Sequence, residues 1–509
     1  METNIIAYDL GTSGCKASLY DASGNCMADS FITCETHYPQ QGWHEQKPKD
    51  WWSAVVQSTK VILAKCNVSV GNISAIGISG HSLGLVPLDK EGKLLASSVP
   101  IWSDSRPTEK ELEAFFSKIP EEEWYMITGN GFPPALYTVF KLMWLKNNQP
   151  ELCSKIHTVV GTKDYINYKM TGVASTDYSY ASGSGVFDLI NWKYSNRLIA
   201  ASGLPATIFP KPVASTDVLG QLSQEVADEL GLHAGVKVVA GGVDNSCMAL
   251  GARCFKEGRT YNSLGSSAWL AVSSQKPLLN PQCRPYVFAH VVPGMFASAT
   301  AIFAAGTSFK WLRNNICDEF MKHEGESWKM MTDLAESAPV GSNKLLFNPS
   351  LAGGTMMDKS AHIKGAIVGI DQSHKKSDII RAVMEGVAMG LRVALDELRN
   401  LISIDNEITV VGGGSKSDFW RQLYADIYNA KIIKTNIDQQ AAALGAAALA
   451  AVGTGIWSDF SIIDKIHQTE SVEVPQVQDN KKYEKILPVY KQLSDYLSEV
   501  GDVLNGLKL

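Results

Sequence analysis

The chain has 509 residues, 45% of them hydrophobic and 19% charged, with a formal net charge of −6. This composition is ordinary for a globular protein, and the length exceeds what one hydrophobic core usually serves, so we expect two large domains. The charge and the absence of a basic block argue against nucleic acid as a standing partner. The longest apolar run, residues 441–453, is too short and too rich in alanine to span a bilayer, so we expect no membrane partner.

Nine cysteines are scattered singly, with no Cys-x-x-Cys pair. This pattern favours a reducing compartment over a disulfide framework or a zinc site. The N-terminus carries no basic region and no long apolar run, so no signal peptide is expected. We therefore expect a cytoplasmic protein.

The first predicted elements form a hairpin. Residues 4–9 and 15–20 are predicted to be its strands, joined by a turn of sequence Leu-Gly-Thr-Ser-Gly. Such a turn can point backbone N–H groups and the hydroxyls of Thr12 and Ser13 at a phosphate. An ordinary hairpin turn has a similar composition, so both interpretations stay open at this point.

Two charged residues flank this turn. Lys16 follows it and can add a cation to a phosphate site. Asp9 precedes it, at the end of the predicted strand, and can hold magnesium directly or through water.

A strand predicted over residues 73–79 ends in Gly-His-Ser-Leu-Gly, after which residues 85–89 continue as a strand. This break can expose His81 and Ser82 to a ligand. A single histidine in a loop is more often a surface or packing residue.

Residues 100–106 combine Trp102 with Asp104 and Arg106. An aromatic face beside a carboxylate and a guanidinium suits a polyol, because it offers a stacking surface and charged hydrogen-bond partners. The alternative is that Trp102 packs in the core and that Asp104 and Arg106 form an ion pair on the surface. Taken alone, these residues favour that alternative.

Three later segments carry weaker signals. Residues 141–145 have helical spacing and are predicted to form a packing helix, whereas residues 161–165 and 181–185 resemble loops near a site.

An acidic residue stands between a strand and a helix near the middle of the chain. Residues 236–240 are β-branched and predicted to form a buried strand, followed by Gly-Gly-Val-Asp-Asn-Ser. Asp244 is therefore expected on the turn, with Asn245 or Ser246 able to cap the helix. Its carboxylate can accept a proton from a substrate hydroxyl or hold magnesium. The alternative is that Asp244 is only a helix cap.

The glycine-hydroxyl turn recurs in the second half. Residues 259–263 and 268–273 are predicted to be strands joined by Leu-Gly-Ser-Ser, which contains Gly265 and Ser266. Two copies of the same turn, one domain apart, suggest a duplicated architecture in which both turns grip one polyphosphate.

Two further glycine segments precede predicted helices. Gly306 lies before one helix, and a strand over residues 408–411 leads into Gly-Gly-Gly-Ser-Lys-Ser and a helix over 418–428. A flat ring or a phosphate can lie against such a backbone. The segment is not a Walker A sequence. Residues 439–452 are predicted to form an Ala/Gly-rich helix suited to close packing, and the tail from residue 459 is predicted to be an amphipathic helix.

Together these motifs resemble the FGGY family of carbohydrate kinases, in the actin-like ATPase superfamily, over residues 5–455. The most specific match is the family's C-terminal signature, met by residues 365–370 and 378–385. The N-terminal signature is nearly met by residues 138–148, but Leu136 stands where an aromatic residue, Met, Gly or Ser is usual.

The resemblance implies an α/β fold of two actin-like (ribonuclease-H-like) domains, each a mixed sheet flanked by helices. We expect the domains to span residues 1–252 and 253–509 and to close over a catalytic cleft that excludes water. The resemblance is also compatible with a homodimer, but no residue of the sequence decides the oligomeric state.

The resemblance also implies ATP and Mg²⁺ as cofactors and a role for each motif. Asp244 aligns with the base that takes the proton from the sugar hydroxyl, and Asp9, with Asp244, lies where the magnesium is held. With the motifs above, the candidate contacts are Thr12, Ser13, Lys16, Gly265 and Ser266 for the phosphates, Gly306, Gly413, Gly414 and Ser417 for the nucleotide, and His81, Ser82, Trp102, Asp104 and Asn245 for the sugar.

The sequence departs from the family's patterns at the substrate. Glycerol kinases carry Arg-Glu where this chain has Ser82 and Leu83, which argues against glycerol. Xylulose kinases usually carry Met-His there, and His81 lies before the position of their histidine. The layout of residues 102–106 and 412–417 is closer to the xylulose-kinase branch, so we expect a ketose or related polyol, with xylulose as one candidate.

Two other functions compete with a sugar kinase. An actin- or chaperone-like machine would use the same nucleotide site, but it needs neither a polyol pocket nor Asp244. A sugar sensor without activity would not need the base either.

Overall fold

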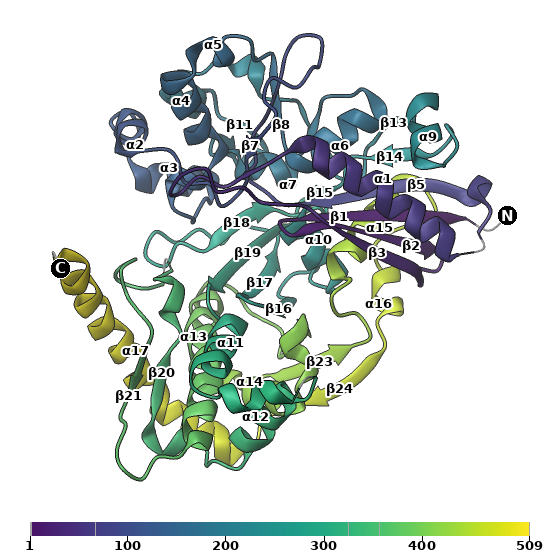
Figure 1. Cartoon of the computed structure of the whole chain (residues 1–509). Helices are drawn as coiled ribbons and strands as arrows, with labels where there is room; N and C mark the ends of the chain where they lie inside the picture. Colours follow the sequence, from purple (N-terminus) through teal and green to yellow (C-terminus); the bar gives the residue numbers. More distant parts are fainter. Residues whose placement is uncertain (1–2, 67, 324, 356, 508–509) are drawn as a thin grey trace.

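The computed structural model describes residues 3–66, 68–323, 325–355 and 357–507, and these form two lobes, each built around a seven-stranded sheet (Figure 1). The first sheet has the order β13-β14-β5-β1-β2-β3, with β15 also paired to β5; the second has the order β18-β19-β17-β16-β22-β23-β24. Both sheets mix parallel and antiparallel pairs, as expected from the sequence.

The strands of the first sheet are β1 (Asn4–Gly11), β2 (Gly14–Asp21), β3 (Cys26–Thr33), β5 (Ile73–Gly80), β13 (Val218–Gln221), β14 (Lys237–Val239) and β15 (Gly242–Val243). Those of the second are β16 (Thr260–Leu264), β17 (Ala268–Ser274), β18 (Tyr286–Ala289), β19 (Phe296–Ile302), β22 (Glu407–Val411), β23 (Lys431–Thr435) and β24 (Thr469–Glu473). Shorter paired strands are β4 (Glu45–Gln46) with β7 (Val99–Pro100), β6 (Val86–Leu88) with β8 (Thr158–Val160), β9 (Thr176–Asp177) with β12 (Pro212–Val213), β10 (Phe187–Asp188) with β11 (Lys193–Tyr194), and β20 (Leu346–Asn348) with β21 (Ala366–Val368).

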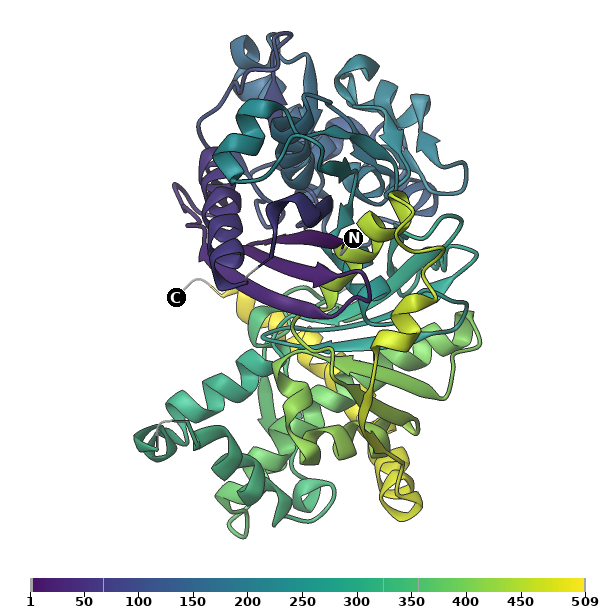
Figure 2. The ribbon, with the colours of Figure 1, turned by 90° about the vertical axis from the view of Figure 1, so that its right-hand side faces the viewer.

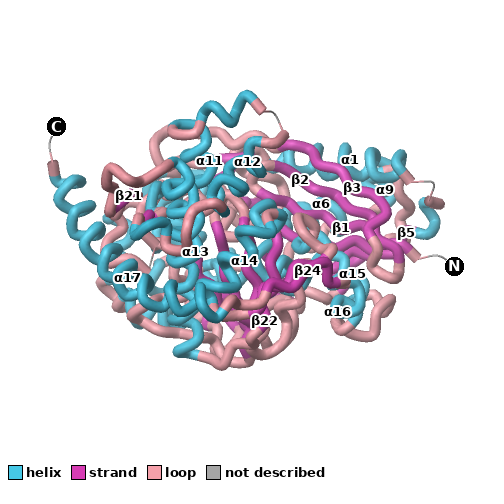
Figure 3. The backbone as a smooth tube through the Cα atoms, turned by 90° about the horizontal axis from the view of Figure 1, so that it is seen from below, coloured by secondary structure: helices cyan, strands magenta, loops and turns pink. Residues whose placement is uncertain are grey.

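The helices of the first lobe are α1 (Pro48–Lys65), α2 (Glu109–Phe116), α3 (Glu121–Thr128), α4 (Thr138–Asn148), α5 (Pro150–Cys153), α6 (Thr162–Thr171), α7 (Tyr178–Ala181), α8 (Asn196–Ser202), α9 (Gln224–Leu230) and α10 (Asp244–Gly251). Later in the chain come α11 (Gly306–Asn315), α12 (Ser327–Glu336), α13 (Lys376–Leu401), α14 (Asp418–Tyr428), α15 (Ala441–Gly453), α16 (Ile462–Ile466) and α17 (Val477–Gly506). Figure 2 shows α1 running along the purple strands β2 and β3, which it contacts. Figure 3 shows α17 ending at the opposite side of the molecule from the N-terminus.

The central strand β5 aligns the ends of two other segments. It is parallel to both β1 and β15, and Ser79 pairs with Asp9 on one side and with Gly242 on the other. Because parallel neighbours in a sheet end at the same edge, Asp9 and the residue that follows β15, Asp244, emerge together.

Two helices made of small residues fill the space between the sheets. α10 and α15 pack against each other, and one hydrophobic cluster joins them to Ile5 of the first sheet and Tyr261 of the second. The approach is close: a Cβ on Gly445 would lie 2.0 Å from the Cys247 carbonyl oxygen, and one on Gly251 would lie 1.8 Å from that of Ala441. The predicted close packing of the Ala/Gly-rich helix is thus confirmed.

Most of the predicted strands and helices are confirmed, with four corrections. Residues 161–165 and 181–185 are not loops, because they lie mainly in α6 and in the short helical turns that begin with α7. Neither Asn245 nor Ser246 caps a helix, because α10 already begins at Asp244. The C-terminal tail contains an edge strand, β24, before its long helix.

The described part of the chain contains no helix that is both long and apolar enough to cross a membrane.

The α10–α15 contact leads to a stability prediction. Gly445→Ala places a methyl group against a backbone carbonyl that cannot rotate away, and overpacking of this kind costs about 1–3 kcal/mol. We expect the melting temperature to fall by about 1–3 °C in a thermal scan, because the unfolding entropy of a chain of this length is about 1 kcal/mol/K. Gly506→Ala is the control, because a Cβ there meets open space. A Gly445→Ala variant as stable as the control would contradict the close packing.

Candidate active site

Two carboxylates lie together where β1 and β15 end. Asp9 accepts a hydrogen bond from the Ser79 hydroxyl (2.9 Å), and Asp244 accepts one from the backbone N–H of Asn245 (2.8 Å). Both are half-buried. Burial, and then the negative charge of Asp9, raises the pKa of Asp244 to about 7, while burial also raises the pKa of Asp9. A carboxyl group with such a pKa can exchange a proton near neutral pH.

Asp244 is not simply a helix cap. The N-cap residue of α10 is Val243, whose backbone is extended, and Asp244 is the first residue inside the helix. Within the part of the chain that the structure describes, its carboxylate accepts a hydrogen bond only from its neighbour's N–H, so the alternative in which Asp244 merely caps the helix is wrong.

The acidic pair fits magnesium that arrives with a nucleotide. Among the residues that the structure describes, no group of three or more His, Cys, Asp or Glu side chains is arranged to hold a metal ion. Mg²⁺ in nucleotide enzymes is usually held by one or two carboxylates together with phosphate oxygens and water. Asp9 and Asp244 match the protein's part of such a set.

The first glycine-hydroxyl turn joins β1 to β2. Thr12 and Ser13 form its tip, and Ser13 is exposed. The Thr12 hydroxyl oxygen accepts a hydrogen bond from the Trp102 indole N–H (2.8 Å), so the turn is tied directly to a residue predicted to bind the sugar. Lys16 pairs across the hairpin with Asp9, and its Nζ donates to the Gln439 carbonyl (3.4 Å).

The second turn is bonded to the start of α11. Gly265 and Ser266 lie at its exposed tip, and their carbonyl oxygens accept bonds from the N–H groups of Gly306 (3.0 Å) and Ala305 (3.0 Å). A Cβ on Gly306 would lie 2.4 Å from the Gly265 carbonyl oxygen, so only glycine fits at this position without moving the turn.

The triple-glycine segment lies against the same turn. Gly412 has a φ of +91°, and a Cβ there would lie 2.8 Å from the carbonyl oxygen of Leu264, the residue before Gly265. Gly413 is exposed and faces open space, which leaves its backbone available to a flat ring. Gly414 packs on the Leu264 side chain, and Ser417 is the N-cap residue of α14. The structure therefore brings together the predicted nucleotide contacts of the second half.

His81 is buried, yet neither ring nitrogen has a hydrogen-bond partner within the described ranges. Burial lowers its pKa to about 4, so the ring is neutral at physiological pH. The ring packs edge-on against Trp51, and Ser82 beside it is also buried. A buried polar ring without partners is unusual and is compatible with a ligand that supplies them.

The contacts of Asp104 differ from those predicted for a residue that binds the sugar. Its side chain is 0% exposed, and its oxygens accept bonds from the Arg106 guanidinium (2.8 Å to each oxygen) and from the backbone N–H of His44 (2.8 Å). Arg106 also bonds Glu45 (2.7 Å) and lies over the Trp43 ring. Asp104 thus braces the loop that carries Trp102, and the alternative of a surface ion pair is wrong because the pair is buried.

One residue beside the site was not predicted. Lys141 on α4 is buried and donates to the carbonyl oxygens of Leu83 (3.0 Å) and Ile101 (2.7 Å). Leu83 has a φ of +58°, which is unfavourable for a branched residue, and Lys141 holds that conformation in place. The available signal was a lysine within the otherwise apolar run of residues 139–145.

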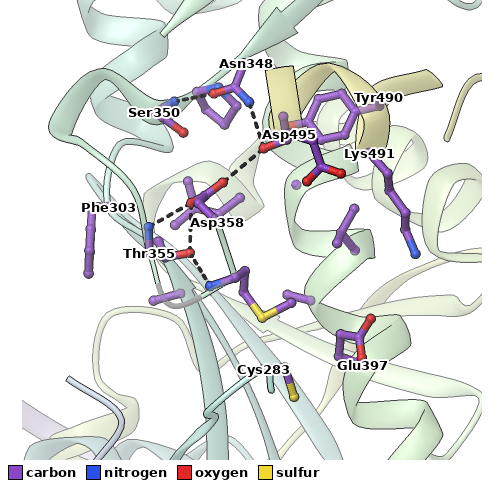
Figure 4. Close-up of a pocket in the computed structure, with 18 of the residues that line it drawn as sticks. Cys283, Phe303, Asn348, Ser350, Thr355, Asp358, Glu397, Tyr490, Lys491 and Asp495 are labelled. Atoms are coloured by element: carbon purple, nitrogen blue, oxygen red, sulfur yellow. Dashed lines mark hydrogen bonds between the residues drawn. The ribbon is translucent and has the colours of Figure 1, made fainter. Parts of the chain in front are cut away.

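A cavity of about 370 Å³ lies elsewhere in the second lobe (Figure 4). It is bordered by the end of β19, by α13 and α17, and by a loop in which Asp358 accepts bonds from Thr355 and Ser494. None of the predicted site residues lines it.

Comparison with known proteins agrees with this arrangement. The N-terminal domain of the FGGY family of carbohydrate kinases matches residues 4–251, and the family's C-terminal domain matches residues 260–454. The chain belongs to this family. It is therefore a phosphotransferase that acts on sugar hydroxyls with ATP as co-substrate, and the predictions of a machine without a sugar substrate and of an inactive sensor are set aside.

The similarity extends over nearly the whole chain. The xylulose kinase of Bacillus subtilis is 29% identical over 508 residues, 99% of each chain. The structure of a gluconate kinase from Lactobacillus acidophilus superimposes with a TM-score of 0.91 at 26% identity, covering 98% of this chain and 99% of that one. A ligand-bound xylulose kinase from the same species gives 0.88 at 26% identity, covering 96% and 97%. The predicted two-domain actin-like fold is confirmed.

The bond between Gly306 and the second turn is testable. In Gly306→Ala the new methyl group must displace the Gly265 carbonyl, and with it the N–H groups at the turn. We expect the dissociation constant for ATP to rise about tenfold or more, measured by calorimetry, because misplaced phosphate donors lose their hydrogen bonds. Gly71→Ala, where a Cβ meets no close neighbour, should bind ATP as the wild type does. Equal affinities in the two variants would remove this turn from the nucleotide site.

Proposed function

We propose that this kinase transfers the γ-phosphate of ATP to a hydroxyl group of a ketose or related polyol, with xylulose as a candidate, and that Asp244 is the general base. The observation that carries this proposal is the pairing of Asp244 with Asp9 at the sheet edge beside the first glycine-hydroxyl turn.

The reaction follows from the arrangement. The sugar hydroxyl oxygen forms a bond to the γ-phosphorus while the bond from that phosphorus to the bridging oxygen of ADP breaks, and the hydroxyl proton passes to the Asp244 carboxylate. Bound Mg²⁺, held by Asp9 with help from Asp244, would neutralise phosphate charge. The turns at Thr12–Ser13 and Gly265–Ser266 would donate hydrogen bonds to the phosphate oxygens.

The surroundings of the two carboxylates favour Asp244 as the base. Burial raises the pKa of Asp9, but the hydrogen bond from the Ser79 hydroxyl and the charge of Lys16 across the hairpin offset part of this rise. Among the described residues, Asp244 has only a backbone N–H for compensation, and its pKa is raised to about 7. Two acidic groups whose environments differ in this way commonly divide the roles of charge stabiliser and proton acceptor.

The cations around the predicted sugar loop favour a neutral substrate over a sugar acid. Arg106 is bonded to two carboxylates, and Lys141 donates to two carbonyls. Lys163, which packs on Gly80, is paired with two aspartates. Each of these three basic groups is already engaged by the protein, and burial lowers the pKa of Lys141 to about 7, which reduces its charge at neutral pH. Trp102, half-buried beside Thr12, offers a face for the sugar's C–H groups.

The experiment that tests the substrate is coupled ADP release with Mg-ATP across a panel of pentuloses, hexuloses, polyols, glycerol and gluconate. We expect one ketose or polyol to be preferred at least tenfold in kcat/KM. A preference for gluconate or glycerol would contradict the substrate class but leave the reaction intact. If no compound in the panel causes ADP release, although ATP is shown to bind, the proposal is contradicted.

Removal of the base gives a separate prediction. Asp244→Asn keeps the size of the side chain but cannot accept the proton, so kcat should fall about 10²–10⁴-fold. ATP affinity should stay within a few-fold of the wild type, because the phosphate turns are unchanged. Near wild-type turnover in this variant would end the assignment of Asp244 as the base.

A further inference from the structure

A cluster of charged side chains is buried behind the segment that leads to Asp244. Lys163 Nζ lies 2.5 Å from Asp164 Oδ1 and 2.9 Å from Asp177 Oδ1, and all three residues are at most 1% exposed. Burial lowers the pKa of Lys163, but the charges of the two aspartates outweigh this and raise it above its ordinary value, so the lysine is charged. The same Nζ donates to the Ala240 carbonyl oxygen (3.1 Å).

A second chain of hydrogen bonds leads from this cluster to the residue before Asp244. Asp177 Oδ2 accepts hydrogen bonds from the hydroxyls of Ser179 (2.5 Å) and Ser215 (2.8 Å). The Ser179 hydroxyl oxygen in turn accepts a hydrogen bond from the backbone N–H of Val243 (2.9 Å). Because the Ser179 proton is given to the carboxylate, its oxygen lone pairs face the amide, which fixes the direction of the contact.

The backbone between these two anchor points has little freedom. Gly241 has a φ of +70°, and a Cβ there would lie 2.0 Å from the Ile78 carbonyl oxygen. Its N–H donates to the Ser215 carbonyl (3.0 Å). Asn167 Nδ2 adds a second bond to the Ala240 oxygen (2.7 Å). The four residues that precede Asp244 are therefore held by side chains and backbone on several sides.

Such a cluster is not explained by stability alone. Buried ion pairs usually stabilise a fold no more than well-packed apolar side chains would, because desolvation offsets their attraction. Their distinctive property is that they define atomic positions through directional, charge-assisted bonds. Here those bonds end on the carbonyl of Ala240 and the N–H of Val243.

We propose that Lys163, Asp177 and Ser179 are positioning residues that hold the Ala240–Val243 backbone and thereby place the Asp244 carboxylate for proton transfer. The inference rests on the proposed role of Asp244 as the base. The cluster acts through the backbone, so its loss affects the chemical step and leaves nucleotide binding at the second turn unchanged.

The test uses the full chain and Ser179→Ala, which removes one hydroxyl and leaves the three charges in place. A misplacement of a reacting group by about 1 Å can lower a rate about 10²-fold. We expect kcat to fall about 10–100-fold, with the KM for ATP within about threefold of the wild type. Hydrogen exchange, measured by mass spectrometry, should show faster exchange in a peptide containing Val243.

Thr128→Val is the matched control. The Thr128 hydroxyl is also buried, donates to a carbonyl (Trp124, 2.8 Å) and accepts a backbone N–H (Asn130, 3.2 Å), but it lies in α3. Its loss should lower stability while kcat stays within twofold of the wild type and exchange at Val243 is unchanged. If Ser179→Ala does not fold, Ser215→Ala, which removes a single bond to Asp177, replaces it with a smaller expected loss of kcat.

The outcomes separate this inference from the proposed function. A folded Ser179→Ala variant with kcat within twofold of the wild type, or with unchanged exchange at Val243, overturns the positioning role. A wild-type protein that phosphorylates no sugar overturns the proposed function instead, and the exchange measurement still decides whether Ser179 fixes the backbone before Asp244.

Discussion

The pairing of β5 with two different strands is the constraint on which the rest of this site depends. Ser79 lies between Asp9 and Gly242 in the sheet, so two carboxylates from distant parts of the sequence are brought to one edge. Like charges in a partly buried place repel each other, and the raised pKa of Asp244 reflects that repulsion together with burial. In the proposed reaction, a magnesium ion and the proton of the sugar hydroxyl would offset this repulsion.

The nucleotide side is organised by close backbone contacts. Gly306 and Gly412 both touch the turn that contains Gly265, and in each case a side chain would collide with a backbone carbonyl. Hydrogen bonds from the start of α11 then fix the direction of the turn. Because a backbone held from several sides needs little reorganisation when a ligand arrives, this geometry suits the binding of a polyphosphate.

The segments around the proposed sugar pocket are held by buried polar and charged groups. The Asp104–Arg106 pair braces the Trp102 loop, Lys141 holds the strained Leu83, and Lys163 with its aspartates holds the segment before Asp244. Each of these side chains is bonded to other protein atoms and lies behind the candidate site. The proposed specificity for a neutral sugar would then depend on the placement of a few polar groups, such as the His81 ring, which has no hydrogen-bond partner among the residues that the structure describes.

Local patterns in the sequence were enough to predict the hairpins, both glycine turns, the triple-glycine segment and the strand before Asp244, because these depend on glycine, hydroxyl groups and β-branched runs. The recurrence of one turn in two halves led to the prediction of a shared polyphosphate site, which stays a prediction. The tertiary structure alone decided that Asp104 is fully bonded, that Lys163 and Ser179 belong to a buried cluster, and that residues 161–165 begin a helix. The burial and the partners of a charged side chain depend on residues far away in the chain. A sequence pattern does not show which distant residues lie close together in space.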